Sequence, residues 1–136
     1  MILFKTDYLV IEFIEEFNYL AHHWSGFCTS DEFRNGISRM VDFTKEYSVE
    51  KILTNVRDQD LVRKEDTDWL TNVAIPKALS NGVRAQAFVL PTDIFTKISV
   101  RNFNNSLPNG NFTIKYFDDL EEASTWITQL CIEKMN

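Results

Sequence analysis

The chain has 136 residues, of which 44% are hydrophobic and 25% are charged, and its formal net charge is −6. This length and composition are typical of one globular domain, residues 1–136, with its own core, which excludes a largely disordered chain. The negative charge, with no run of Lys and Arg, is unfavourable for nucleic acid and for anionic membranes, so we expect neither nucleic-acid binding nor membrane insertion.

Two apolar, strand-like runs come first, at residues 8–14 and 18–24. Their short separation, residues 15–17, predicts an antiparallel hairpin, and its exposed edge is a candidate homodimer interface. The first run is too short to span a bilayer and lacks the cationic flank of a signal peptide. We therefore expect a cytoplasmic protein.

Helix and strand patterns then alternate. Thr29 and Glu32 have the spacing of a capping box, and the apolar residues that follow at helical period predict a helix over about residues 30–47. A buried strand is predicted at 52–56. It leads into a predicted helix at 64–80.

The helix at 64–80 contains Pro76, which has no amide hydrogen and clashes with the preceding turn. We therefore predict a kink near Ile75 and a helix end at Asn81-Gly82, where glycine favours a left-handed stop. The remaining predicted elements are a buried strand at 85–90, a helix opened by Pro91-Thr92-Asp93, a turn-rich loop at 104–111, a strand at 112–116 and a last helix.

The last helix has Asp118 or Asp119 as its predicted cap. Its predicted buried face consists of Leu120, Ala123, Trp126, Ile127 and Leu130. Taken together, the element order predicts an α/β fold with a mostly parallel sheet of about five strands, opened by a β-hairpin, and about four helices.

The histidines and cysteines give little sign of catalysis or metal binding. Adjacent residues of a strand point to opposite faces, so His22 and His23 cannot converge on one metal ion. Cys28 precedes the first predicted helix, whose dipole could lower the pKa of its thiol. If the protein is an enzyme, Cys28 is therefore the candidate nucleophile. Cys131 is far from Cys28 in sequence, and two cysteines in a cytosolic protein of this size are usually free thiols. We predict no cofactor, no metal and no catalytic residue.

The passage from Lys51 to Leu70 is the strongest functional signal. A buried strand runs into a polar turn, Asp58-Gln59-Asp60, and then into a helix, and ligands of open α/β domains collect at the carboxyl ends of strands. The acidic residues at the helix start, Glu65, Asp66 and Asp68, are explained as a solvated first turn. The candidate partner or ligand residues are Trp24, Asn55, Arg57, Asp58, Asp60, Asp66 and Trp69.

Several of these segments together resemble the SpoIIAA-like, or STAS/SEC14-like, group of small bacterial proteins. The residues that carry the resemblance are Trp24-Ser25-Gly26, the run at 51–57, the helix with Asp66, Trp69 and Pro76, Gly82 before Ala87-Phe88-Val89, and Tyr116-Phe117-Asp118-Asp119-Leu120 followed by Ala123 and Trp126. The resemblance implies a domain related to anti-sigma factor antagonists and, more distantly, to lipid-carrying SEC14 domains.

The phosphorylated serine of those antagonists has no counterpart here. Their Asp-Ser-(Ser/Ala)-Gly turn reads Asp58-Gln59-Asp60-Leu61 in this chain, and no serine occurs between Val49 and Leu79. Thr67 and Thr71 are conjectural substitutes. We therefore expect the fold of this group without its phosphoserine switch.

Three functions stay open at this stage. The first is a non-catalytic regulatory module that docks a protein partner through residues 57–63 and the start of the next helix. The second is a carrier of a small apolar ligand or lipid, with Trp24 and Trp69 as pocket walls. The third is an enzyme that uses Cys28, His22 or His23.

Overall fold

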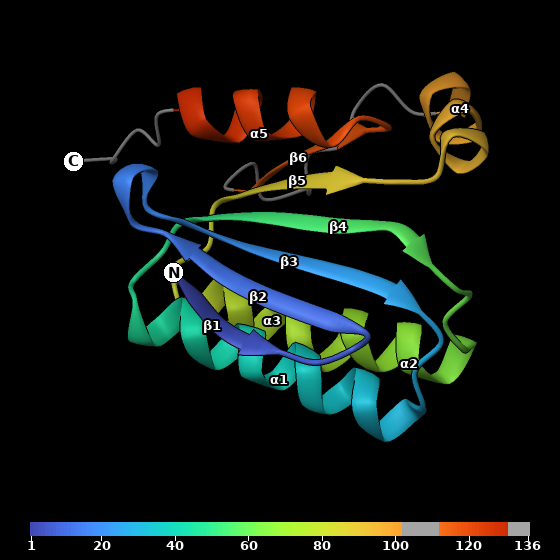
Figure 1. The fold of residues 1–136 in the computed structure, drawn as a ribbon, viewed down its shortest axis with the longest axis horizontal. Helices are drawn as coiled ribbons and strands as arrows, with labels where there is room; N and C mark the ends of the chain where they lie inside the picture. The colour runs from blue at the N-terminus through green and yellow to red at the C-terminus, as the bar shows by residue number, and fades with distance from the viewer. Residues whose placement is uncertain (102–111, 131–136) are drawn as a thin grey trace.

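One six-stranded sheet organises the molecule, and its strands lie side by side in chain order (Figure 1). The computed structural model describes residues 1–101 and 112–130, with side chains up to residue 96 in the first segment. The strands are β1 (Ile2–Lys5), β2 (Leu9–Ile14), β3 (Tyr19–Gly26), β4 (Lys51–Gln59), β5 (Ala85–Val89) and β6 (Thr113–Phe117). Strands β1, β2 and β3 pair antiparallel, and β3 to β6 pair parallel. The predicted α/β class with a mostly parallel sheet is confirmed.

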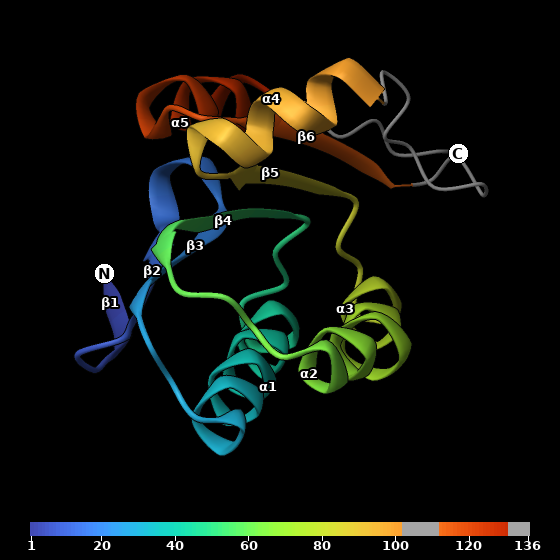
Figure 2. The same cartoon turned by 90° about the vertical axis from the view of Figure 1, so that its right-hand side faces the viewer.

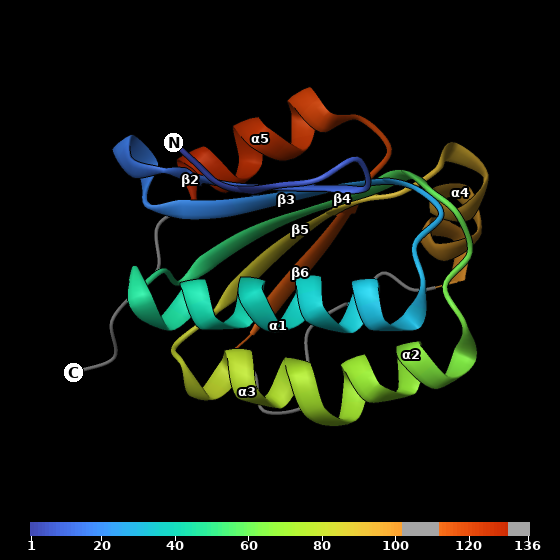
Figure 3. The ribbon, with the colours of Figure 1, turned by 60° about the horizontal axis from the view of Figure 1, so that its bottom comes forward.

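Helices cover both faces of this sheet (Figure 3). They are α1 (Ser30–Glu46), α2 (Lys64–Trp69), the π-helical turn η2 (Leu70–Ala74), α3 (Ile75–Ser80), α4 (Thr92–Arg101) and α5 (Leu120–Gln129), with a short 3-10 turn η1 (Glu15–Phe17) between β2 and β3. The helices α1, α2 and α3 lie on one face and α5 lies on the other. The predicted loop at 104–111 falls outside the described residues.

Strand β1 is the main element that the sequence prediction missed. It has only four residues and no alternation of buried and exposed positions, so it gives no strand pattern. It pairs with β2, and the sheet therefore has six strands rather than about five. The outer edge of the hairpin is therefore paired with β1, so β1 and not the hairpin forms this edge of the sheet, and the homodimer stays a prediction.

The core has two layers, one on each side of the sheet. Alternation along β3 separates them: Leu20 and Trp24 face α1, whereas Tyr19 and Ala21 face α5. Of the predicted inner face of the last helix, Ala123 and Ile127 are buried, and the prediction for Leu120 is wrong because that side chain is exposed. Leu120 opens the helix directly after its cap, Asp119, before the helix turns toward the sheet.

Helix α1 begins as predicted. The Thr29 amide donates to Glu32 Oε1 at 2.9 Å, and the Glu32 amide donates to Thr29 Oγ1 at 3.2 Å, which completes a capping box. One turn further, Gly36 lets the helix approach the sheet closely. A Cβ atom at Gly36 would lie 2.6 Å from Leu9 Cδ2 and 2.8 Å from the Trp24 ring.

The predicted interruption near Ile75 in the helical segment from Lys64 to Ser80 is confirmed, because α3 begins at Ile75 after a turn of different type. Residues 70–74 form a π-helical turn, in which the Ile75 amide donates to the carbonyl of Leu70, five residues back. A wider turn just before a proline relieves the clash of its ring with the preceding backbone and accommodates its missing amide hydrogen. The segment ends at Gly82, whose φ of +107° is accessible to glycine.

Candidate functional site

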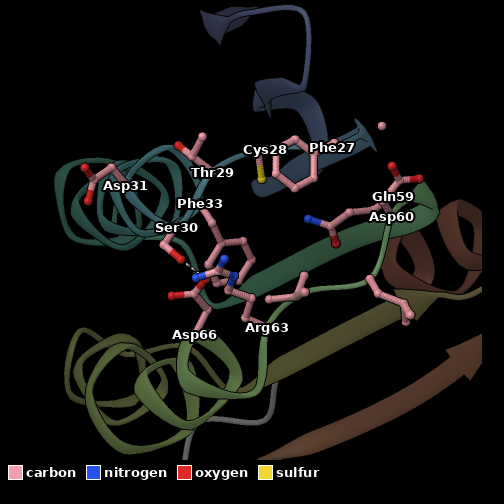
Figure 4. A pocket seen from close by; sticks show the side chains of 13 residues that line it. Phe27, Cys28, Thr29, Ser30, Asp31, Phe33, Gln59, Asp60, Arg63 and Asp66 are labelled. Carbon is pink, nitrogen blue, oxygen red and sulfur yellow. Dashed lines mark hydrogen bonds between the residues drawn. The ribbon is translucent and has the colours of Figure 1, made fainter.

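A cavity opens where the chain leaves the carboxyl ends of β3 and β4. Figure 2 views this end of the sheet, with the connections to α1 and α2 in front. The cavity, called here the outer cavity, has a volume of about 310 Å³ (Figure 4). Its lining comes from residues 26–31, Phe33, residues 59–63 and Asp66. The predicted position of the site at this end of the sheet therefore coincides with a cavity.

Asp66 forms a structural wall of the outer cavity. It is only 3% exposed, and its carboxylate accepts hydrogen bonds from Ser30 Oγ at 2.7 Å and Arg34 Nε at 2.9 Å. The bond from Ser30 is the main cause of a lowered pKa of Asp66; burial opposes it, and Arg34 adds to the lowering. The interpretation of Asp66 as part of a solvated first turn is therefore wrong. It fastens the start of α2 to the start of α1.

Cys28 lies in the same lining but is not an activated thiol. Its pKa is raised, first by burial and then by the negative charges of Glu32 and Asp66, while the amide of Gln59 opposes this because it would donate to a thiolate. The expectation that the helix dipole lowers this pKa is wrong, because the pKa is raised, by burial first and by the two carboxylates after it. The geometry therefore gives Cys28 no nucleophilic activation.

We expect Cys28 to react slowly with alkylating reagents. In a Cys131→Ser variant, which leaves Cys28 as the single thiol, the second-order rate constant with iodoacetamide at a mildly alkaline pH should lie below that of N-acetylcysteine, because less thiolate is present. The unfolded variant in urea serves as the control for access. A folded-state rate above that of the model thiol would contradict the pKa direction.

A second cavity, called here the inner cavity, lies between the sheet and the helices α1 and α2–η2 and is also open to solvent, since Thr67 in its lining is exposed. Its volume is about 180 Å³, and it shares Phe33, Gln59 and Val62 with the outer cavity. A third space of about 60 Å³ shares five residues with it, namely His22, Ile37, Leu70, Ile75 and Gln86. The other residues of the inner cavity are Trp24, Thr54, Val56, Thr67 and Phe88. Most of this lining is apolar, and the described side chains in it include no lysine, arginine or carboxylate.

A chain of hydrogen bonds crosses the wall of the inner cavity. Trp24 Nε1 donates to His22 Nδ1 at 2.9 Å, and His22 Nε2 lies 2.6 Å from Thr54 Oγ1. Burial, and then the charge of His23, lower the pKa of His22 to about 3, so the imidazole is neutral near pH 7. Because an indole can only donate, Nδ1 carries no proton, and the single imidazole proton is on Nε2. His22 therefore donates to Thr54.

The hydroxyl of Thr54 can then donate one further hydrogen bond. Its oxygen also accepts from Gln86 Nε2 at 2.7 Å, so both of its lone pairs are used. Within the described part of the chain, no acceptor is found for the hydrogen of this hydroxyl. Thr54 is 4% exposed and lines the inner cavity. The hydrogen of this buried hydroxyl is thus available to an acceptor in the cavity, since the described residues offer none.

Gln59 provides a second such donor, and a bulge in β4 places it there. His23 pairs with Asn55, and Ser25 pairs with Asp58, so β4 contains one more residue than β3 over this step. The extra residue reverses the alternation, which brings Gln59 to the same face as Thr54. Figure 4 shows its amide directed into the outer cavity. Gln59 Nε2 is buried and makes no hydrogen bond of ordinary geometry among the described residues, although it is near enough to Cys28 to stabilise a thiolate there.

The predicted site residues separate into two groups. Asp60 and Asp66 line the outer cavity and Trp24 lines the inner cavity. The remaining four, Asn55, Arg57, Asp58 and Trp69, line neither. Asp58 belongs to β4 rather than to the predicted polar turn, because pairing with β3 continues to Gln59. The Trp69 ring is covered by Arg34, whose guanidinium carbon is 5.3 Å from the ring centroid.

His23 and Asn55 belong to the opposite face of the sheet. Asn55 Nδ2 lies 3.0 Å from His23 Nδ1, and Glu12 Oε1 lies 3.8 Å from His23 Nε2. The predicted separation of the two histidines onto opposite faces is therefore confirmed. Residues 1–101 and 112–130 contain no group of three His, Cys, Asp or Glu side chains that could hold a metal ion.

Fold and cavities together define an α/β domain with connected spaces at the carboxyl ends of its central strands. Comparisons with protein-family models, curated proteins and solved structures find no match for this chain. The resemblance to the SpoIIAA-like group therefore stays a hypothesis. Among the helices within the described ranges, none has both the length and the apolar character needed to cross a membrane.

Proposed function

We propose that this protein is a non-catalytic binding domain for a small, largely apolar molecule, which it holds in the inner cavity. The observation that carries the proposal is a space of about 180 Å³ inside a wall of aromatic and aliphatic side chains. An engineered apolar cavity of about 150 Å³ in another protein binds benzene, so the inner cavity has room for a molecule with one ring or a short aliphatic chain.

The outer cavity gives this molecule a route of entry. Phe33, Gln59 and Val62 separate the two spaces, and Val62 is only half-buried in the connection between β4 and α2. The pKa values of His22 and Cys28 support binding rather than catalysis. His22 has a lowered pKa, so its imidazole is a weak base near pH 7, and Cys28 has a raised pKa, so little of its thiol is ionised.

Titration of the ¹⁵N-labelled protein with benzene and α-methylstyrene tests this proposal. The indole N–H signal of Trp24 should shift and saturate, because Trp24 lines the inner cavity, whereas the indole signals of Trp69 and Trp126, which do not line it, should stay in place. Val62→Phe should fill the passage and weaken binding, and Val73→Phe, at an exposed position that lines neither cavity, is the matched control. No response of Trp24 to either hydrocarbon would contradict the proposal.

A protein partner at the mouth of the outer cavity is the second candidate function. Phe27 is 71% exposed and Leu61 is 93% exposed, and both line that cavity. Exposed apolar side chains beside a cavity are typical of binding surfaces. If a partner is captured from the source cell, Phe27→Ser and Leu61→Ser should abolish its capture, whereas Phe17→Ser, at another exposed phenylalanine outside the cavity, should not. Equal loss in all three variants would argue against this surface.

A further inference from the structure

We propose that the ligand of the inner cavity is an uncharged molecule whose carbonyl oxygen accepts a hydrogen bond from the Thr54 hydroxyl. This inference rests on the proposed function and specifies the chemistry of its ligand. It starts from the count of donors and acceptors around Thr54. Trp24 fixes the tautomer of His22, and His22 and Gln86 then fill both lone pairs of the Thr54 oxygen. The hydroxyl proton is left to donate into the cavity.

A buried donor without a partner is unfavourable, by an amount that exceeds the net gain of an ordinary hydrogen bond. A ligand that supplies an acceptor at this point removes that cost, whereas a hydrocarbon of the same shape does not. Gln59 Nε2, the second buried donor, is directed into the outer cavity instead (Figure 4). The polar group that awaits a partner in the inner cavity is therefore the Thr54 hydroxyl, a donor, and it selects ligands that carry an acceptor.

Charge is excluded by the same lining. Among the residues whose side chains the structure describes, no arginine or lysine faces the inner cavity, and His22 is neutral, so a carboxylate would meet no counter-ion from them. A cationic ligand would likewise meet no carboxylate there, since Asp60 and Asp66 line only the outer cavity. A ketone, ester or amide group on a small apolar body meets both requirements.

Acetophenone and α-methylstyrene form a suitable pair of probes, because they differ in C=O against C=CH₂ and have nearly the same shape. Thr54→Val should weaken acetophenone binding about tenfold and leave α-methylstyrene within about twofold, because the valine methyl replaces the donor. Thr54→Ser keeps the hydroxyl and should retain acetophenone binding. Benzoate should not bind at neutral pH. Equal effects of Thr54→Val on both probes would overturn the inference.

A measurement on the unmodified protein keeps the inference testable if Thr54→Val does not fold. In the acetophenone complex, nuclear Overhauser effects should join the acetyl methyl of the ligand to the Thr54 methyl, and the phenyl protons should contact Phe33 or Val62. The reverse orientation, with the phenyl ring at Thr54, would overturn the inference. Binding of both probes with the reverse orientation leaves the proposed function intact, whereas no binding of either probe removes the function itself.

Discussion

Lowering the pH from about 7 to about 4 is expected to reduce the free energy of unfolding by about 3 kcal/mol through His22 alone. The pKa of His22 is lowered to about 3 in the folded protein, first by burial and then by the charge of His23, from an ordinary value of 6.5. At a pH between these two pKa values, the unfolded chain binds a proton at His22 and the folded protein does not. Stability is therefore lost progressively as the pH falls from about 6.5 toward 3.

The contribution of His22 can be separated from that of the carboxylates. The pKa of Asp66 is lowered in the folded protein, so its stabilising contribution, present near neutral pH, is also lost on acidification. Urea unfolding of the wild type and His22→Gln, at several pH values between 7 and 4, measures the difference. Glutamine can still accept from Trp24 and donate to Thr54. The variant should have a shallower pH dependence, whereas His23→Gln, which removes only the smaller, charge-based cause of the lowered pKa of His22, should change the pH dependence less.

An equal pH dependence of the wild type and His22→Gln would contradict the assignment, whatever the absolute stability of the variant. The slope is the informative quantity, because the substitution also changes packing around the inner cavity. A wild type that loses stability only below pH 4 would likewise contradict it, since His22 should act mainly above that value.

Gly36→Ala is expected to destabilise the protein by about 1 to 2 kcal/mol, although alanine is the better helix former by about 1 kcal/mol. Gly36 lies inside α1 and faces the sheet, and its added methyl group would lie within 3 Å of both Leu9 and Trp24. Both neighbours are buried, so the methyl group can be accommodated only by shifting core side chains or the helix.

Thermal or urea unfolding measures this effect, and two further variants make it specific. Ser38→Ala, at an exposed position of the same helix, should be neutral or slightly stabilising. Leu9→Val shortens the side chain nearest to the new methyl group, so the double variant with Gly36→Ala should be more stable than the sum of the single changes predicts. Stabilisation by Gly36→Ala would show that the helix is not held as closely to the sheet as described.

The sequence predicts well those features that depend on neighbouring residues. The capping box of Thr29 and Glu32, the stop at Gly82 and the opposite faces of His22 and His23 follow from local geometry, and the structure confirms them. The same local reasoning identifies the end of the sheet at which the cavities lie, because parallel strands place their carboxyl ends together. These features require no knowledge of distant contacts.

The residues that give the inner cavity its chemistry depend on distant contacts and could not be predicted in the same way. Thr54 looks like an ordinary strand residue until β3 brings His22 to it and β5 brings Gln86. Asp66 looks like a solvated acid until Ser30 and Arg34, more than thirty residues earlier, contact it. Single-sequence periodicity contains no information about such pairs.

Because of the bulge in β4, the fold should tolerate the deletion of one residue at this point better than the insertion of one. Loss of Arg57 would convert the bulge into regular pairing and leave Asp58 and Gln59 on their present sides, since the residue removed is the surplus one. Insertion of one more residue there would instead exchange the two sides and bring a carboxylate to the wall of the cavity. At this point a shortened chain is therefore less harmful to the binding surface than a lengthened one.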